Sequence, residues 1–338
     1  MSSNSDKQQQ TIYNTGEFLP AIKNAPEGRS IELVTNSPEF QAIQNNPAIV
    51  YLMTLSSKKS RQTMRSFLNT VAKMVGFQGI QDCPWHTLRR LHVQAVIEML
   101  SDAGRAPATI NIYLSALKSV AREAWSMNQI DTDSYQHIKH VRSVKGTRLQ
   151  KGRALTRQEL ETLFFICEKD TTAKGVRDAA IFSIMVGCGL RRSEVVSLNY
   201  ESIVQREQAL IVMGKGNKER MAYMPDGTFK KLQAWITEVR GHEPGPLFNR
   251  IRRFDEVTDS RLTDQAVYHL LDTRRLEAGL DKFAPHDMRR TFATIMLDNG
   301  VDIVTLKDAM GHNDIATTQK YDRRGDDRLK AASLKIKI

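Results

Sequence analysis

A basic segment divides this chain into two parts and so constrains what it can fold into. Residues 142–153 contain five basic residues, two glycines and no acidic residue. Such a composition is typical of a flexible linker between domains. A chain of 338 residues is long enough for two domains and their flanks. The segment could also lie along a polyanion as a basic strap, and the two interpretations are compatible.

The part before this segment, residues 41–141, has the pattern of a small helical bundle. Its apolar residues recur at three- and four-residue steps, which places them on one face of each helix. Gly104 and Pro107 separate the second helix from the third. The pattern predicts three apolar stripes around one core: Met64, Phe67, Leu68, Val71, Met74 and Val75; Leu91, Val96, Ile97 and Leu100; Ile110, Leu114, Leu117, Val120 and Ala121.

The part after it, residues 154–326, mixes helix and strand signals. Thr156 and Glu159 form a capping box in front of an apolar stripe, which predicts a helix start. Residues 209–213 and 220–224 predict two strands around a Gly-rich turn. A helix is expected from Asp302 to Met310, with Gly311 as its end. The expected fold is therefore mainly α with a small β-sheet: an N-terminal helical domain and a C-terminal α+β domain.

Six residues of the second part carry groups suited to breaking a phosphodiester: Arg191, Lys215, His286, Arg289, His312 and Tyr321. A phenol can form a covalent intermediate, and nearby cations favour its ionised form. Guanidinium forks bind phosphate oxygens with paired hydrogen bonds. A lysine or histidine can protonate the departing oxygen. Two of the six lie three residues apart on a predicted helix and so share a face.

The segments that carry these residues resemble, in this order, the catalytic domain of the tyrosine recombinases, the phage-integrase and Xer-type enzymes. They read GLRRSE at 189–194, GKGNKER at 214–220, PHDMRR at 285–290, GH at 311–312 and TTQKY at 317–321. The resemblance runs from about Ala154 to the C-terminus. A weaker one covers about 45–145, where APATIN at 106–111 and LSALKS at 114–119 are similar to the core-binding domain of the same enzymes.

The resemblance implies a role for each matching residue. Tyr321 would be the nucleophile that forms a 3′-phosphotyrosyl bond. Arg191 and Arg289 would hold the phosphate. Lys215, on a hairpin turn, would protonate the 5′-oxygen that leaves.

Three further roles follow from the same resemblance. His312 would be a donor to the phosphate. His286 would move a proton to or from the tyrosine. Glu194 would orient an arginine. The family needs no metal and no cofactor, so none is expected here.

The charge balance agrees with a polyanionic partner. Lys and Arg number 49 against 38 Asp and Glu, which gives a formal charge of +11 and a pI near 9.5. The partner implied is double-stranded DNA at a specific recombination site, bound by a homo-tetramer on synapsed DNA, with accessory proteins possible. No long apolar run or signal peptide is present, so no membrane partner is expected. Basic side chains of the helical part could contact phosphate or only solvent: Lys58, Lys59, Arg61, Arg65, Lys118 and Arg122.

The three cysteines, Cys83, Cys167 and Cys188, lack the spacing of a metal site or a disulfide framework. They are expected to be reduced thiols in a cytoplasmic protein.

Three other functions are alternatives to recombination. A type IB topoisomerase shares the chemistry but would act on one duplex instead of joining two. A basic DNA-binding protein with a decayed site is disfavoured by the complete residue set. A metal nuclease is disfavoured because no Asp/Glu cluster accompanies the six residues.

The two ends of the chain carry weaker signals. Residues 1–40 are rich in Ser, Asn, Gln and Pro and predict a loosely ordered arm. Residues 327–338 keep apolar side chains among lysines. They could close the fold of their own domain, but we expect them to dock on a neighbouring subunit, as the resemblance implies.

Overall fold

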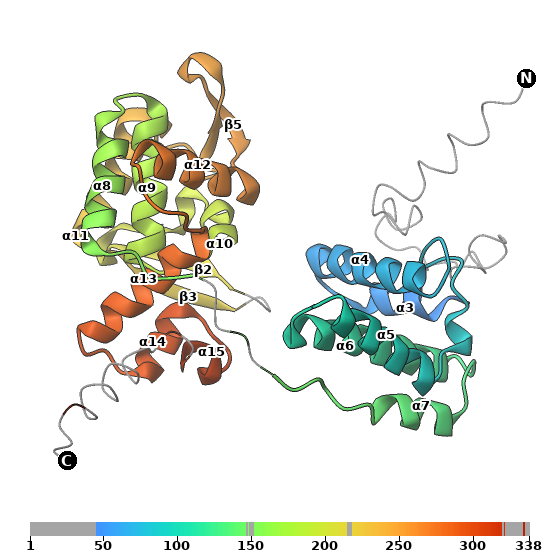
Figure 1. Cartoon of the computed structure of the whole chain (residues 1–338). Helices are drawn as coiled ribbons and strands as arrows, with labels where there is room; N and C mark the ends of the chain where they lie inside the picture. Colours follow the sequence, from blue (N-terminus) through green and yellow to red (C-terminus); the bar gives the residue numbers. More distant parts are fainter. Residues whose placement is uncertain are drawn as a thin grey trace, which may run out of the picture. The chain divides into compact units, whose positions relative to one another are not determined.

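The computed structural model describes residues 45–146, 148, 152–214, 218–319, 321 and 334. The chain is divided into two compact units, and the boundary between them lies between residues 148 and 152 (Figure 1). No helix among the described residues is long and apolar enough to cross a membrane. The predicted arm at 1–40 lies outside the described residues. The domain limits at 41, 141, 154 and 326 stay predictions.

The first unit is a helical bundle. Its described helices begin at clear signals, such as the Ser57 hydroxyl that accepts from the Ser60 amide and the proline at the first position of α6. The elements are α3 (Pro47–Thr54), α4 (Lys58–Met74), η1 (Trp85–Thr87), α5 (Arg90–Asp102), α6 (Pro107–Ser126) and α7 (Thr132–Lys139).

One of the predicted stripes holds and two are partly wrong. The α6 stripe is buried throughout. In α4, Leu68 and Val71 are buried, but Val75, at the end of that stripe, is 39% exposed. In α5, however, Leu91 is 75% exposed, and Val93 lies in the core with Val96 and Leu100. In α5, which begins at Arg90, the residues at positions 93, 96 and 100 form the buried face. Leu91 lies on the opposite side of the helix and points away from the core.

The first residues of the predicted linker are fastened to this bundle. The Asn111 side chain accepts from the Val144 amide at 2.9 Å and donates to the Val144 carbonyl at 3.0 Å. Lys118 Nζ donates to the Val141 carbonyl at 2.7 Å. Lys118 therefore has a structural partner of its own, which sequence analysis did not anticipate. After α7, the chain therefore stays bound to α6 up to at least Val144.

The second unit combines helices with two small sheets. Its elements are α8 (Arg157–Lys169), α9 (Ala173–Gly187), α10 (Arg192–Ser197), η2 (Tyr200–Ser202), β1 (Ile203–Val204), η3 (Gln205–Glu207), β2 (Ala209–Met213), β3 (Glu219–Tyr223), α11 (Asp226–Ala234), the π-helical turn η4 (Trp235–Arg240), β4 (Asn249–Ile251), η5 (Arg253–Asp255), β5 (Val257–Arg261), α12 (Asp264–Glu277), α13 (Pro285–Asp298), α14 (Ile303–Met310) and α15 (Ile315–Gln319).

Helix α9 is the centre of this unit. Its residues from Ala179 to Met185 are all buried, because α8, α11 and α13 pack around it. The predicted capping box starts α8: the Thr156 hydroxyl accepts from the Glu159 amide at 3.2 Å, and the Glu159 carboxylate accepts from the Thr156 amide at 2.8 Å. Helix α9 is thus a core helix, and it leads directly to the turn before Arg191.

The predicted hairpin is confirmed, with its second strand one residue earlier than expected. Strands β1, β2 and β3 form an antiparallel sheet in that order, and Met213 pairs with Glu219 at the end where the chain passes from β2 to β3. Strands β4 and β5 form a second hairpin. Helix α14 contacts both β3 and α13 (Figure 1). The hairpin therefore lies beside the helices that carry the C-terminal part of the site.

A small apolar cluster holds the end of the described chain. It contains Phe292 and Leu297 of α13, Leu306 and Met310 of α14, and Tyr321. The helix predicted from Asp302 begins there, because the Asp302 carboxylate accepts from the amides at Val304 and Thr305. Packing between two helices thus fixes where Tyr321 lies.

Candidate active site

Arg191 lies at the start of α10, at the turn that follows α9. The turn depends on Gly189, whose φ is +63° and whose added Cβ would lie 2.3 Å from the Phe292 ring. Arg191 Nη1 donates to Glu194 Oε1 at 2.6 Å, and the Arg191 amide donates to Oε2 at 2.9 Å. Glu194 is 5% exposed. Glu194 thus binds Arg191 at two points, and its role in orienting an arginine stays a prediction.

Arg289 lies on α13 and is 1% exposed. Its guanidinium donates to the Gly189 carbonyl and, at 2.5 Å, to the Met310 carbonyl, so it joins the α9–α10 turn to the end of α14. Burial and the nearby Arg191 lower its pKa from 12.5 to about 10. Its Nε has no acceptor among the residues that the structure describes. A buried cation with an unused donor is suited to binding an anion.

His312 follows Gly311, which ends α14 in the left-handed conformation at φ +61°. Its Nε2 lies 2.8 Å from Arg289 Nη2, and its Nδ1 lies 2.8 Å from the Thr318 hydroxyl. Because a guanidinium only donates, Nε2 accepts and the ring proton is on Nδ1. Burial and Arg289 lower the pKa of His312 to about 4, so the ring is neutral near pH 7. The donor role implied for His312 would need the other tautomer.

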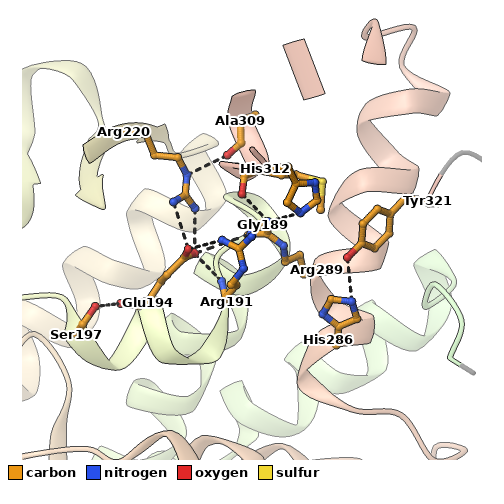
Figure 2. Close-up of polar contacts among 11 residues, drawn as sticks. Gly189, Arg191, Glu194, Ser197, Arg220, His286, Arg289, Ala309, His312 and Tyr321 are labelled. Carbon is orange, nitrogen blue, oxygen red and sulfur yellow. Dashed lines mark hydrogen bonds and ion pairs between the residues drawn. The ribbon is translucent and has the colours of Figure 1, made fainter. Parts of the chain in front are cut away.

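Tyr321 is 7% exposed and contacts both histidines (Figure 2). Its hydroxyl lies 2.9 Å from His286 Nε2. Its ring stacks on His312, with centroids 5.8 Å apart and planes at 16°, and the Arg290 guanidinium lies 5.4 Å from the ring centroid. The phenol is therefore held in place by aromatic and cationic neighbours on α13 and after α14.

His286 lies near the start of α13, one turn before Arg289, and is exposed. Although the residue is exposed overall, partial desolvation of its ring, which faces Tyr321, and the charges of Arg290 and Arg289 lower the pKa of His286 below 6.5. A neutral ring has a free lone pair, so Nε2 can accept the proton of the Tyr321 hydroxyl. His286 and Arg289 lie three residues apart on one helix, as predicted, where His286 contacts Tyr321 and Arg289 contacts His312.

The structure thus brings together five of the six predicted residues: Arg191, His286, Arg289, His312 and Tyr321. The sixth, Lys215, lies outside the described residues, between the ends of β2 and β3. All three cysteines are buried, free thiols, and burial raises the pKa of Cys188 to about 12.

Two residues of the site were missed from the sequence. Arg220 donates to both carboxylate oxygens of Glu194, and Thr318 binds the His312 ring. Arg220 was visible in the GKGNKER segment, but a charged residue on a strand usually faces solvent. Thr318 gave no signal beyond its place three residues before Tyr321.

The family match agrees with this geometry. The phage integrase family matches residues 153–328, and the phage integrase N-terminal SAM-like domain matches residues 49–128. The chain therefore belongs to the phage integrase family, and it is a site-specific tyrosine recombinase.

Its relatives are recombinases of bacterial origin. It is similar to tyrosine recombinase XerD of Oceanobacillus iheyensis, with 30% identity over 278 residues that cover 80% of this chain and 90% of the relative. It is also similar to tyrosine recombinase XerC of Alcanivorax borkumensis, with 30% identity over 243 residues that cover 70% of this chain and 76% of the relative.

Solved structures share the fold. The Tn1549 transposon integrase in complex with circular intermediate DNA matches with a TM-score of 0.60 at 18% identity, over 82% of this chain and 94% of that one. A lambda integrase dimer bound to a core site matches with a TM-score of 0.61 at 17% identity, over 84% of this chain and 95% of that one. At these identities the likeness concerns the fold.

Proposed function

We propose that this chain cleaves and rejoins double-stranded DNA through a covalent bond between Tyr321 and a 3′-phosphate. The observation that carries the proposal is the position of the Tyr321 hydroxyl, 2.9 Å from a proton acceptor on His286 and beside a cluster of arginines. A nucleophile, a base and an anion-binding group in one place are the parts that phosphoryl transfer to a protein side chain requires.

The proposed step balances as follows. The phenolic oxygen forms a bond to phosphorus as its proton passes to His286 Nε2. The bond from phosphorus to the 5′-oxygen breaks, and Lys215 gives that oxygen a proton. Arg191 and Arg289 bind the non-bridging oxygens, whose charge rises in the transition state. Rejoining reverses each transfer, so the energy of the broken bond stays in the phosphotyrosine and no nucleotide cofactor is needed.

For His312 we propose a supporting role. Its Nε2 accepts from Arg289 at 2.8 Å, and Thr318 holds the ring in the tautomer that makes this possible. His312 would then fix the direction in which Arg289 presents its remaining donors, and its ring also stacks on Tyr321. His312 would thereby hold both the phosphate-binding Arg289 and the nucleophile Tyr321 in position.

We further propose a tetramer on two synapsed duplexes, because exchange of strands between duplexes needs one active site for each strand. Residues 327–338 are the proposed docking tail; apart from Leu334, which is exposed, they lie outside the described residues. A closed ring of head-to-tail contacts would couple the four subunits. The basic segment 142–153 and the arm at 1–40 are proposed to add contacts to the DNA backbone or to accessory proteins.

The test is covalent trapping. The full chain is incubated in EDTA with fragmented DNA that contains candidate sites, then denatured, and protein-linked DNA is recovered and sequenced. We expect one recurring sequence on the wild type and none on Tyr321→Phe, which removes only an oxygen. A duplex with that sequence should then recombine with a second copy. Adduct in Tyr321→Phe, strict dependence on added Mg²⁺, or relaxation of one duplex without joining of two would contradict the proposal.

A further inference from the structure

Arg220 is buried inside the site but has no role in the steps above. It lies on β3, and its side chain is 12% exposed. Nη2 donates to Glu194 Oε2 at 2.9 Å, Nη1 lies 3.3 Å from Oε1, and Nε donates to the Ala309 carbonyl at 3.2 Å (Figure 2). Each of the three guanidinium nitrogens is thus engaged inside the protein, on one carboxylate and on the end of α14.

Glu194 is shared by three arginines. Besides Arg220, it binds Arg191 at 2.6 Å and lies 3.8 Å from Arg289 Nη1. Three guanidinium groups and one carboxylate leave two positive charges at the site, whereas two guanidinium groups and the same carboxylate would leave one. Without Arg220, the charge of Glu194 would be offset by the phosphate-binding arginines alone.

The protonation of Glu194 depends on the same contacts. Burial alone would raise its pKa, but hydrogen bonds from Arg220 and from the Arg191 amide hold the pKa below 4.5. The carboxylate is therefore charged at neutral pH and competes with any phosphate for the guanidinium groups around it.

Arg220 also fixes the end of α14. A Cβ added at Gly311 would lie 3.0 Å from Arg220 Nη1 and 3.1 Å from its Cζ, so the guanidinium packs directly on the glycine. The next residue is His312. The fork therefore ties the carboxylate that orients Arg191 to the turn that carries the partner of Arg289.

We infer that Arg220 is a positioning residue of strand cleavage: it takes up the charge of Glu194 and locks that carboxylate to the end of α14, so that Arg191 and Arg289 keep their remaining donors and positive charge for the scissile phosphate. This inference rests on the proposed function. The described hydrogen bonds of Arg220 all go to Glu194 and Ala309, so we assign it a role in positioning the phosphate-binding arginines and no bond to the phosphate itself.

The experiment measures single-turnover adduct formation on the duplex recovered by trapping, with the full chain. Arg220→Met keeps the length of the side chain but removes the fork and the charge. We expect a rate about 100-fold lower, with the affinity for DNA little changed. Arg220→Lys keeps the charge and should recover part of the rate. Arg240→Met is the matched control, since that half-buried arginine donates to carbonyls at 241–246.

A double-mutant cycle separates positioning from a general effect on folding. In a Glu194→Gln background there is no carboxylate charge to take up, so Arg220→Met should slow the reaction by less than about tenfold further. Full, additive losses would overturn the inference, as would a wild-type rate in Arg220→Met. Absence of adduct with the wild-type chain would instead refute the proposed function. If Arg220→Met fails to fold, as judged by circular dichroism, the same double-mutant cycle is measured with Arg220→Lys, and its result decides on the inference.

Discussion

At the scale of single residues, the position of the ring proton of His312 decides between two roles: a donor to the phosphate, or an acceptor from Arg289. Arg289 and Thr318 together place that proton on Nδ1, so Nε2 supports the phosphate-binding Arg289 by accepting a hydrogen bond from it. A neutral, buried histidine has a consequence for stability, because the unfolded chain binds the proton more readily than the folded one.

The pH dependence follows from the lowered pKa. The ordinary value is 6.5 and the value in the folded chain is about 4. The contribution of the neutral ring is full above about pH 6.5 and is lost as the pH falls toward 4, by about 3 kcal/mol in total. Urea unfolding of the full chain should therefore show a stability loss in this window that His312→Asn, which cannot titrate, reduces. An identical pH profile for the variant would show that His312 is not neutralised by folding.

Lys215 can be tested through the leaving group. Lys215→Ala should slow cleavage about 10²- to 10⁴-fold, because the 5′-oxygen then leaves without a proton. A bridging sulfur leaves without one, so it should restore most of the rate in Lys215→Ala. Arg191→Ala, which lacks a phosphate-binding group instead, should gain much less. Equal rescue of both variants, in the same single-turnover assay, would refute the acid role.

At the scale of elements, the site forms where the start of α10, the start of α13 and the end of α14 meet. The type and order of these elements could be predicted, because caps, glycines and apolar stripes are local signals. The contacts of Arg220 and Thr318 could not, because they join segments that only packing brings together. The error at Leu91 has a similar cause: packing selects which apolar side of α5 is buried, and it buries Val93, Val96 and Leu100 and leaves Leu91 exposed.

The α9–α10 turn gives a prediction at this scale. Gly189→Ala should destabilise the chain by about 2–4 kcal/mol, because φ is positive there and the new Cβ would overlap the Phe292 ring. Phe292 shares a cluster with Tyr321, so adduct formation should fall as well. Gly227→Ala in α11 is the control: its Cβ meets nothing within 4 Å, and the change should be under about 1 kcal/mol. Equal melting temperatures for the two variants would count against this account of the turn.

At the scale of the whole molecule, the two units and the tail must act together on DNA. Truncation after Asp327 removes the proposed docking tail. Binding to a single half-site should remain nearly intact, whereas cooperative assembly on a full site and strand exchange should fall by at least about tenfold. Gel-shift titration and a recombination assay give both quantities. A truncated chain that recombines normally, or that cannot fold, would rule out docking on a neighbour.

The central claim is that one named oxygen attacks the DNA. Mass spectrometry of protease digests of the trapped adduct, formed in EDTA, identifies both the residue and the end of the DNA that is joined to it. The account predicts a nucleotide linked by its 3′-phosphate to the peptide that contains Tyr321, and to no other peptide. A nucleotide on another residue, such as the exposed Tyr223 of β3, or a link through a 5′-phosphate, would contradict it.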